Sequence, residues 1–464
     1  MTNKISRRNM FKQSLAGLTA AALCGPAWAQ QRKKRPNIVF ILADDLGYGD
    51  LGCYGQQKIQ TPNLDAFARE GMRFTQCYAG STVCAPSRCC LMTGLHTGHA
   101  RVRGNKRVPL RPEDTTVAEL LKTAGYDTAL IGKWGLGEPD TTGVPNRKGF
   151  DYFFGYLNQG HAHNYYPEYL WRNEEKVPLE GNVESAEQPR YSIERAQYSH
   201  DLFTNEALQY LDEHKDGPFF LYLAYTLPHA NNERGRATGD GMEVPDYGSY
   251  DDKNWPNPQK GHAAMISRLD RDVGRVVQKL RDLGIDEDTI VFFTSDNGTH
   301  QEGGADPEFF GSSGPLRGIK RDMYDGGIRV PGMARWPGRI EPGVSDQVWA
   351  FWDFLPTALE LAGAGDGTPD KIDGQSIAPH LIQGKHVEHK PLYWEFHEGG
   401  YKRSARMGDW KGVLLKPDEP IELYDLSKDV GETCNVAEEH PRIVKRFERF
   451  FKNARTFNED WPAR

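Results

Sequence analysis

One cysteine of the chain, Cys84, lies in a context that favours chemistry over packing. It stands in the run Val83-Cys84-Ala85-Pro86-Ser87-Arg88, although a lone cysteine is most often a buried structural thiol. Pro86 suits the first turn of a helix, and Ser87 can cap it. Arg88 places a permanent cation one helical turn beyond the sulfur. The combination favours a functional residue at the start of a helix.

Two adjacent carboxylates, Asp44 and Asp45, follow an apolar run. An aspartate pair after a strand is often only a turn or a helix cap. Because successive strand residues face opposite sides, both carboxylates can reach one ligand only where the strand has ended, which is where they stand. Asp296 and Asn297 follow a second apolar run in the same way.

These four groups predict a metal site. Carboxylates packed together in an apolar crevice cost several kcal/mol per charge unless a cation compensates them. The set offers only hard oxygen ligands, and the sequence has no His or Cys cluster at zinc spacing. It therefore favours calcium, with magnesium second.

Secondary-structure elements must position these side chains. Along the chain, predicted strands alternate with predicted helices. The strands are continuous apolar runs, which is typical of strands buried on both faces of a parallel sheet. The pattern indicates an α/β fold with the sheet sandwiched between helices. We predict strands at 38–43, 128–131, 219–223 and 289–294, and helices at 116–124, 201–214 and 263–283.

Polar residues follow each of the four predicted strands, with Lys133 after the second and His229 after the third. Taken singly, a solvated lysine and a structural histidine are the ordinary interpretations. Open α/β sheets, however, bind ligands beyond the carboxyl ends of their strands. We therefore expect the four clusters to meet in one crevice. Arg88, Lys133 and Lys320 together would supply three cations for a dianionic transition state.

The run around Cys84, followed by Leu91-Met92-Thr93-Gly94, resembles the Cys-x-Pro-Ser-Arg signature of the formylglycine-dependent sulfatases. The resemblance extends from about Pro36 to about Glu438. It implies an alkaline-phosphatase-like α/β sandwich with a large mixed, mostly parallel sheet, plus a smaller C-terminal antiparallel sheet with a helix. In that family a maturation enzyme, formylglycine-generating or radical, oxidises the cysteine to formylglycine, whose hydrated aldehyde attacks sulfur.

The resemblance also implies roles for the other residues. His229 or Lys320 would protonate the departing alcohol, and the second aldehyde hydroxyl would then expel sulfate. The implied metal ligands are Asp44, Asp45, Asp296 and Asn297, with the oxygen of residue 84. The implied catalytic residues are Cys84, Arg88, Lys133, His229 and Lys320.

The chain departs from the family at Gly135. The family commonly has Gly-Lys-Trp-His-Leu-Gly where this chain has Gly132-Lys133-Trp134-Gly135-Leu136-Gly137. The histidine that usually contacts the formylglycine hydroxyl is therefore absent. The candidates to replace it are His300, His161 and His163, each of which has a surface or substrate-contacting role as its ordinary interpretation.

The N-terminal segment predicts export. Arg7-Arg8 precede the apolar run 15–23 and then Ala27-Trp28-Ala29, which is typical of a twin-arginine signal cleaved after Ala29. The apolar run is too short to span a bilayer, so we expect no transmembrane segment. Ordinary export, or retention through a lipid on Cys24, is the alternative. We expect a signal at 1–29, a basic linker at 30–35 and a periplasmic or secreted protein.

Composition limits the function further. The 464 residues carry a net charge of −7, from 57 basic and 64 acidic residues. This balance argues against a nucleic-acid partner and requires a locally basic pocket for a sulfated substrate. The six cysteines beyond the signal are too few for a disulfide framework. We expect a catalytic domain at 36–363 and a C-terminal subdomain at 364–464, with short antiparallel strands and a helix at 443–454.

The expected activity is hydrolysis of a sulfate ester. The stretches 98–105 and 296–304 resemble carbohydrate sulfatases related to the N-acetylgalactosamine-6-sulfatases. This implies exo-action on sulfated galactose or N-acetylgalactosamine, with His300, Glu302 and Arg101 as substrate contacts. Aryl sulfates should be poor substrates. The alternatives are a phosphonate monoester or phosphodiester hydrolase of the same fold, and a non-catalytic protein that binds sulfated glycans.

Overall fold

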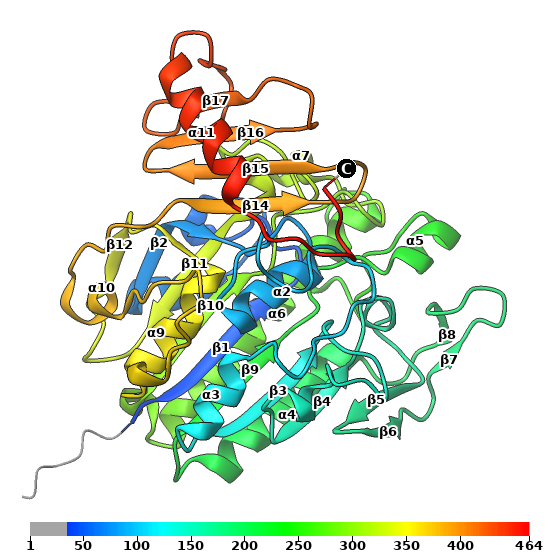
Figure 1. Ribbon diagram of the computed structural model, residues 1–464. Helices are drawn as coiled ribbons and strands as arrows, with labels where there is room; N and C mark the ends of the chain where they lie inside the picture. The colour runs from blue at the N-terminus through cyan, green and yellow to red at the C-terminus, as the bar shows by residue number, and fades with distance from the viewer. Residues whose placement is uncertain (1–34, 464) are drawn as a thin grey trace, which may run out of the picture. The chain divides into compact units, whose positions relative to one another are not determined.

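A large mixed sheet runs through the computed structural model, which describes residues 35–463 (Figure 1). Its eleven strands follow the order β12-β2-β11-β10-β1-β9-β3-β4-β5-β6, and β13 also pairs with β2. The central strands are parallel: β10 (Thr289–Ser295), β1 (Asn37–Ala43), β9 (Phe219–Ala224), β3 (Asp127–Lys133) and β4 (Tyr152–Tyr156).

The four strands predicted from apolar runs are therefore present and adjacent, each one to three residues longer than predicted. Their register aligns the carboxyl ends, because Ala43 pairs with Ser295 while Leu42 and Gly132 both pair with Ala224. The residues that follow these strands consequently meet at one edge of the sheet, as the sequence predicted.

The outer strands make the sheet mixed. On one side β11 runs antiparallel to both β10 and β2, and on the other β5 and β6 continue antiparallel beyond β4. These strands are β2 (Met72–Tyr78), β11 (Arg329–Arg335), β12 (Gly343–Ser345), β13 (Trp349–Ala350), β5 (Tyr169–Arg172) and β6 (Glu175–Pro178), with a separate hairpin of β7 (Val183–Glu184) and β8 (Ser192–Glu194).

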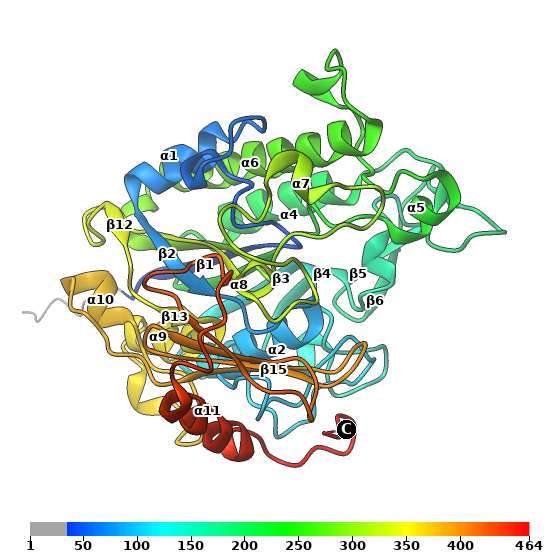
Figure 2. The same cartoon turned by 90° about the horizontal axis from the view of Figure 1, so that it is seen from above.

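Helices cover both faces of the main sheet, and alternate residues of β1 belong to two different cores. Figure 2 shows α1, α4 and α6 on one side and α2 and α9 on the other. This double burial explains why the central strands are continuously apolar. The helices are α1 (Pro62–Glu70), α2 (Cys84–Thr93), α3 (Val117–Thr123), α4 (Ser199–His214), α5 (Asn232–Thr238), α6 (Asn257–Asp282), α7 (Pro307–Phe310), α8 (Asp325–Ile328), α9 (Phe354–Leu361) and α10 (Ala378–Gln383).

A smaller antiparallel sheet follows near the C-terminus, and α11 packs on it through Phe447 and Phe451 (Figure 1). This sheet starts at Leu392, and side chains of its first strand such as Trp394 and Phe396 belong to the same core as Ile377 and Leu381. Its elements are β14 (Leu392–Phe396), β15 (Lys402–Met407), β16 (Trp410–Leu414), β17 (Glu422–Asp425) and α11 (Pro441–Asn453).

The predicted export signal at 1–29, with Cys24, and all but the last residue of the predicted linker lie outside the described residues. Among the helices of the described part, none is both long enough and apolar enough to cross a membrane. The six cysteines of residues 35–463 are all free thiols.

Candidate active site

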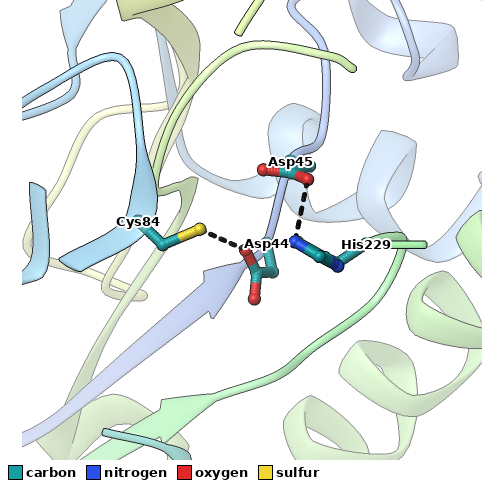
Figure 3. A group of neighbouring side chains, drawn as sticks. All are labelled: Asp44, Asp45, Cys84 and His229. Atoms are coloured by element: carbon teal, nitrogen blue, oxygen red, sulfur yellow. Dashed lines mark hydrogen bonds and ion pairs between the residues drawn. The ribbon is translucent and has the colours of Figure 1, made fainter. Parts of the chain in front are cut away.

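The end of β1 brings two carboxylates into one buried site. Asp44 and Asp45 are both completely buried, and Asp45 adopts a left-handed φ of 67° directly after the strand. Aspartate is one of the few residues that tolerates this region. Figure 3 shows both side chains beside Cys84 and His229, and the backbone N–H of Asp45 donates to Asp296 Oδ1 at 3.2 Å.

Cys84 is the first residue of α2, and its Sγ lies 3.2 Å from Asp44 Oδ1. Ser87 does not cap this helix, because the helix starts three residues earlier and the Ser87 hydroxyl accepts from the backbone N–H of Gly80 instead. Burial, with the charges of Asp296 and Asp44, raises the pKa of the Cys84 thiol well above its usual value. The thiol therefore stays protonated and is a poor nucleophile as it stands.

Three cations converge on these carboxylates. Arg88 Nε and Nη2 each lie 2.9 Å from Asp296 Oδ2. Lys133 Nζ lies 2.6 Å from Asp44 Oδ2, and Lys320 Nζ lies 2.7 Å from Asp45 Oδ2. The three cationic side chains have 2% or less of their surface exposed, so each is held by the pairing. The cluster therefore places several charges together where solvent hardly reaches them.

Although three cationic side chains pair with them, the carboxylates and Asn297 also fit a site for a metal cation. Burial and the charge of Asp44 raise the pKa of Asp296 to about 7. Asn297 donates from Nδ2 to Asp45 Oδ1 at 2.7 Å, while its buried Oδ1 has no partner among the described residues. A hard divalent cation would hold Asp296 ionised and give Asn297 Oδ1 a partner, so the predicted ligand set fits calcium or magnesium.

His229 faces the same carboxylates with one ring nitrogen. Its Nδ1 lies 2.7 Å from the carbonyl oxygen of Ala230, which can only accept, so this nitrogen carries the proton of the neutral ring. Nε2 lies 3.5 Å from Asp45 Oδ2 and 3.3 Å from Lys320 Nζ. Burial and the charge of Lys320 lower the pKa of His229 to about 3. The neutral ring therefore directs a lone pair towards the lysine ammonium.

His300 is buried beside this cluster, but both of its ring nitrogens are engaged. Nε2 lies 3.2 Å from the carbonyl oxygen of Pro228, and Nδ1 accepts from the backbone N–H of Glu302 at 3.0 Å. His300 therefore has no free donor or acceptor with which to replace the family histidine. Its contacts instead support the loop that carries His229.

The other predicted substrate contacts separate into two groups. Glu302 lies at the site, with Oε2 at 3.3 Å from Lys320 Nζ and Oε1 at 2.5 Å from Arg321 Nη1. Arg101 does not join the cluster, because its guanidinium pairs with Asp460 at 2.6 Å.

The two remaining histidines also differ. His163 Nδ1 lies 3.0 Å from Glu233 Oε2, and its ring stacks on that of His229 with centroids 5.0 Å apart. His161 packs against Tyr156 and Tyr169. The amide of Gln159 fills the space beside Gly135. No sequence pattern identified Gln159. The one available signal was the glycine at 135, which leaves space for a side chain from elsewhere in the chain.

Comparison with known proteins identifies the family. The sulfatase family model matches residues 36–364, and a model for the N-sulphoglucosamine sulphohydrolase C-terminal region matches residues 319–455. N-acetylgalactosamine-6-sulfatase from Sus scrofa is 34% identical over 441 residues, covering 88% of this chain and 78% of the relative. Arylsulfatase A from Homo sapiens is 33% identical over 454 residues, covering 86% of this chain and 83% of the relative.

A solved structure described as Ps i-CgsB in complex with k-i-k-neocarrahexaose matches with a TM-score of 0.78 at 27% identity, over 93% of this chain and 95% of that one. The mixed sheet, its helices and the small antiparallel sheet place the protein among hydrolases of the alkaline-phosphatase-like fold. The chain belongs to the sulfatase family and is a sulfuric ester hydrolase. The expected family, fold and enzyme class are thereby confirmed.

Proposed function

We propose that the protein is an exported, calcium-dependent sulfatase that uses formylglycine at position 84 and removes sulfate from terminal galactose or N-acetylgalactosamine residues of glycans. The observation that carries this proposal is the position of Cys84. Cys84 is the first residue of α2, and its thiol contacts Asp44. Burial and nearby carboxylates keep this thiol protonated. A residue placed at the centre of the charges but unable to act as a thiolate is a reasonable target for oxidation by a maturation enzyme.

The formylglycine would supply, as its hydrated aldehyde, one hydroxyl to attack sulfur and a second to release the sulfate. Calcium, held by Asp44, Asp45, Asp296 and Asn297, would polarise the sulfate oxygens when bound.

The chain's own cations then stabilise and orient the substrate. Lys133 and Arg88 reach the site from β3 and α2, each fixed by a carboxylate before substrate arrives. Such preorganised charge costs no reorganisation during the reaction. Lys320 Nζ, which carries protons, lies 3.3 Å from His229 Nε2, whose lone pair faces it. The pair is therefore placed to deliver a proton to the departing alcohol oxygen.

The proposed substrate class rests on the relatives and on the site. The relatives include N-acetylgalactosamine-6-sulfatases, whose name specifies a sulfated sugar, and the matching solved structure is described as a complex with k-i-k-neocarrahexaose. Glu302 lies beside Lys320, where a carboxylate can accept from a sugar hydroxyl. Sites built to bind hydroxyls discriminate strongly against substrates that lack them.

Ion chromatography of the products, sulfate from the sulfate esters and phosphonate from the phosphonate monoester, tests the proposal. Purified, matured protein is incubated with the 4- and 6-sulfates of galactose and N-acetylgalactosamine, with an aryl sulfate, and with a phosphonate monoester. We expect a sulfated sugar to give the highest kcat/KM. A phosphonate monoester as the best substrate would favour the hydrolase of the same fold. Binding of sulfated sugars without any turnover, in protein with unmodified Cys84, would favour the non-catalytic alternative.

A further inference from the structure

A cavity of about 190 Å³ lies between the loops that follow β3 and β4 and the loop around Asn105. We call it the Gln159 cavity. Its lining is Asn105, Lys106, Arg107, Val108, Gly135, Gly137, Glu138, Asn158, Gln159, Gly160 and Arg190.

The Gln159 cavity adjoins the active site through two of its walls. Gly135 lies two residues after Lys133, whose Nζ contacts Asp44. Asn105, which also lines the cavity, accepts at Oδ1 from the backbone N–H of Ala85 at 3.2 Å, directly after Cys84. A molecule that reacts at residue 84 therefore has this cavity beside it.

Gln159 brings an unused hydrogen-bonding group to the cavity. Both its Nε2 and its Oε1 are buried and have no partner among residues 35–463. A Cβ at position 135 would lie 2.4 Å from Nε2, so a side chain there would displace the amide from its present position. Gly135 also has a φ of +86°, which disfavours other residues. Buried amides without partners are rare because a buried polar group that loses its hydrogen bond is destabilising. A ligand with a donor and an acceptor would satisfy both atoms.

The remaining polar groups of the lining favour a negative ligand. Three cations line the cavity against one carboxylate, Glu138. Their ion pairs are long: Lys106 to Asp460 at 3.7 Å, Arg107 to Glu138 at 3.7 Å and Arg190 to Glu233 at 3.6 Å. The cationic side chains are between 40% and 61% exposed. These groups consequently keep most of their donors free for an anion.

We propose that the Gln159 cavity is a subsite for a sugar ring that carries a second anionic group beside the reacting sulfate. The Gln159 amide binds ring hydroxyls, because its adjacent donor and acceptor match a pair of neighbouring hydroxyls. The surrounding cations bind the second anion. This inference rests on the proposed function, since it places the ring of the sulfated sugar next to residue 84.

The test uses N-acetylgalactosamine 4-sulfate, 6-sulfate and 4,6-disulfate as probes. Binding is measured by calorimetry in the Cys84→Ala background, where turnover cannot interfere. We expect the disulfate to bind more tightly than either monosulfate. Gln159→Ala should weaken binding of all three probes about 10- to 100-fold. Arg107→Gln should remove the preference for the disulfate while leaving the monosulfates almost unchanged. The matched control is Gln278→Ala, which removes an exposed glutamine of α6 whose amide donates to Asp282.

Kinetics of the enzyme with Cys84 intact separate this inference from the proposed function. Gln159→Ala should lower kcat/KM on the best sulfated sugar by the same factor of about 10 to 100 by which it weakens binding. It should change kcat/KM on an aryl sulfate, which has no ring hydroxyls, by no more than about twofold. Equal losses on sugar and aryl sulfate, or no weakening of probe binding, would overturn the subsite. Absence of probe binding to the Cys84→Ala protein would overturn it too. Binding that depends on Gln159 without any sulfate release would contradict the proposed function and leave the subsite standing.

Discussion

Asp44 connects the nucleophile position to the cations of the site. One of its oxygens lies 3.2 Å from Cys84 Sγ and the other lies 2.6 Å from Lys133 Nζ. Burial alone would raise the pKa of Asp44, but the charges of Lys133 and Arg88 lower it well below its usual range. The carboxylate is therefore ionised at neutral pH, and Lys133 is its nearest cationic partner.

Lys133→Ala should lower kcat on a sulfated sugar by about 10²- to 10³-fold, because it removes one preorganised cation from the developing negative charge. Steady-state kinetics measures the effect. Lys452→Ala, which removes an exposed lysine from α11, should leave kcat unchanged. Circular dichroism distinguishes lost chemistry from lost folding. A folded Lys133→Ala protein with normal kcat would contradict this role.

The site residues that follow strands could be predicted from the sequence. The residues whose role depends on hydrogen bonds or ion pairs between distant loops could not. Asp44, Lys133, His229 and Asp296 stand just beyond apolar runs, so their convergence follows from sheet geometry. The bonds of His300 to Pro228 and Glu302 depend on how two loops fold together. No local pattern encodes such bonds. The same holds for the pairing of Arg101 with Asp460.

At the scale of elements, the close approach of β3 to β9 sets the position of Lys133. A Cβ on Gly132 would lie 2.0 Å from the carbonyl oxygen of Ala224, and Gly132 has a φ of +112°. Glycine is therefore required where the two strands end.

Gly132→Ala should destabilise the fold by about 2–5 kcal/mol, from the steric clash and the unfavourable φ together. It should also reduce turnover, since Lys133 would shift with the strand end. Urea unfolding measures the first effect, and kinetics measures the second. Gly367→Ala is the matched control, because a Cβ there meets nothing within 4 Å. Equal stability of the two variants would show that the strand ends tolerate a side chain.

Element types were predictable because the central strands are apolar on both faces and the long helices are amphipathic. The residues at which elements begin and end were less predictable. The helix predicted at 263–283 starts at Asn257 in the structure, and α2 starts at Cys84 without a side-chain cap. Tertiary packing, which buries every residue of α2, replaces the cap that the sequence suggested.

At the scale of the whole molecule, Glu395 ties the small sheet to the main body. It lies on β14 and pairs with Arg103 at 2.9 Å and with Arg455 at 3.0 Å. Burial alone would raise the pKa of Glu395, but a hydrogen bond from His397 and the charge of Arg103 lower it to about 2.

Because the pKa of Glu395 is lower in the folded state than its ordinary value of 4.5, ionisation favours folding. The stabilisation is complete above pH 4.5 and is lost as the pH falls towards 2. It amounts to roughly 3 kcal/mol. Urea unfolding at several pH values should show a shallower acid loss for Glu395→Gln than for the wild type, with the variant less stable at pH 7. If the unfolding free energies of the wild type and Glu395→Gln changed in parallel with pH, this contribution of Glu395 to stability would be excluded.

The metal site should also affect global stability. A cation that binds only the folded state stabilises it by about 4 kcal/mol at a thousandfold excess over its Kd. We therefore expect chelation to lower Tm and activity together and calcium to restore both. Asn297→Ala should need more calcium for the same Tm, whereas Asn453→Ala on α11 should not. Metal-free protein, shown by elemental analysis, that keeps its Tm and activity would contradict the proposed site.

The central claim concerns the chemical state of residue 84, and mass spectrometry of the peptide that contains it is the most direct test. In active protein produced with its maturation machinery, the account predicts an aldehyde in place of the Cys84 thiol. The extent of this conversion should match the fraction of active enzyme. An unmodified thiol at position 84 in fully active protein would contradict the account.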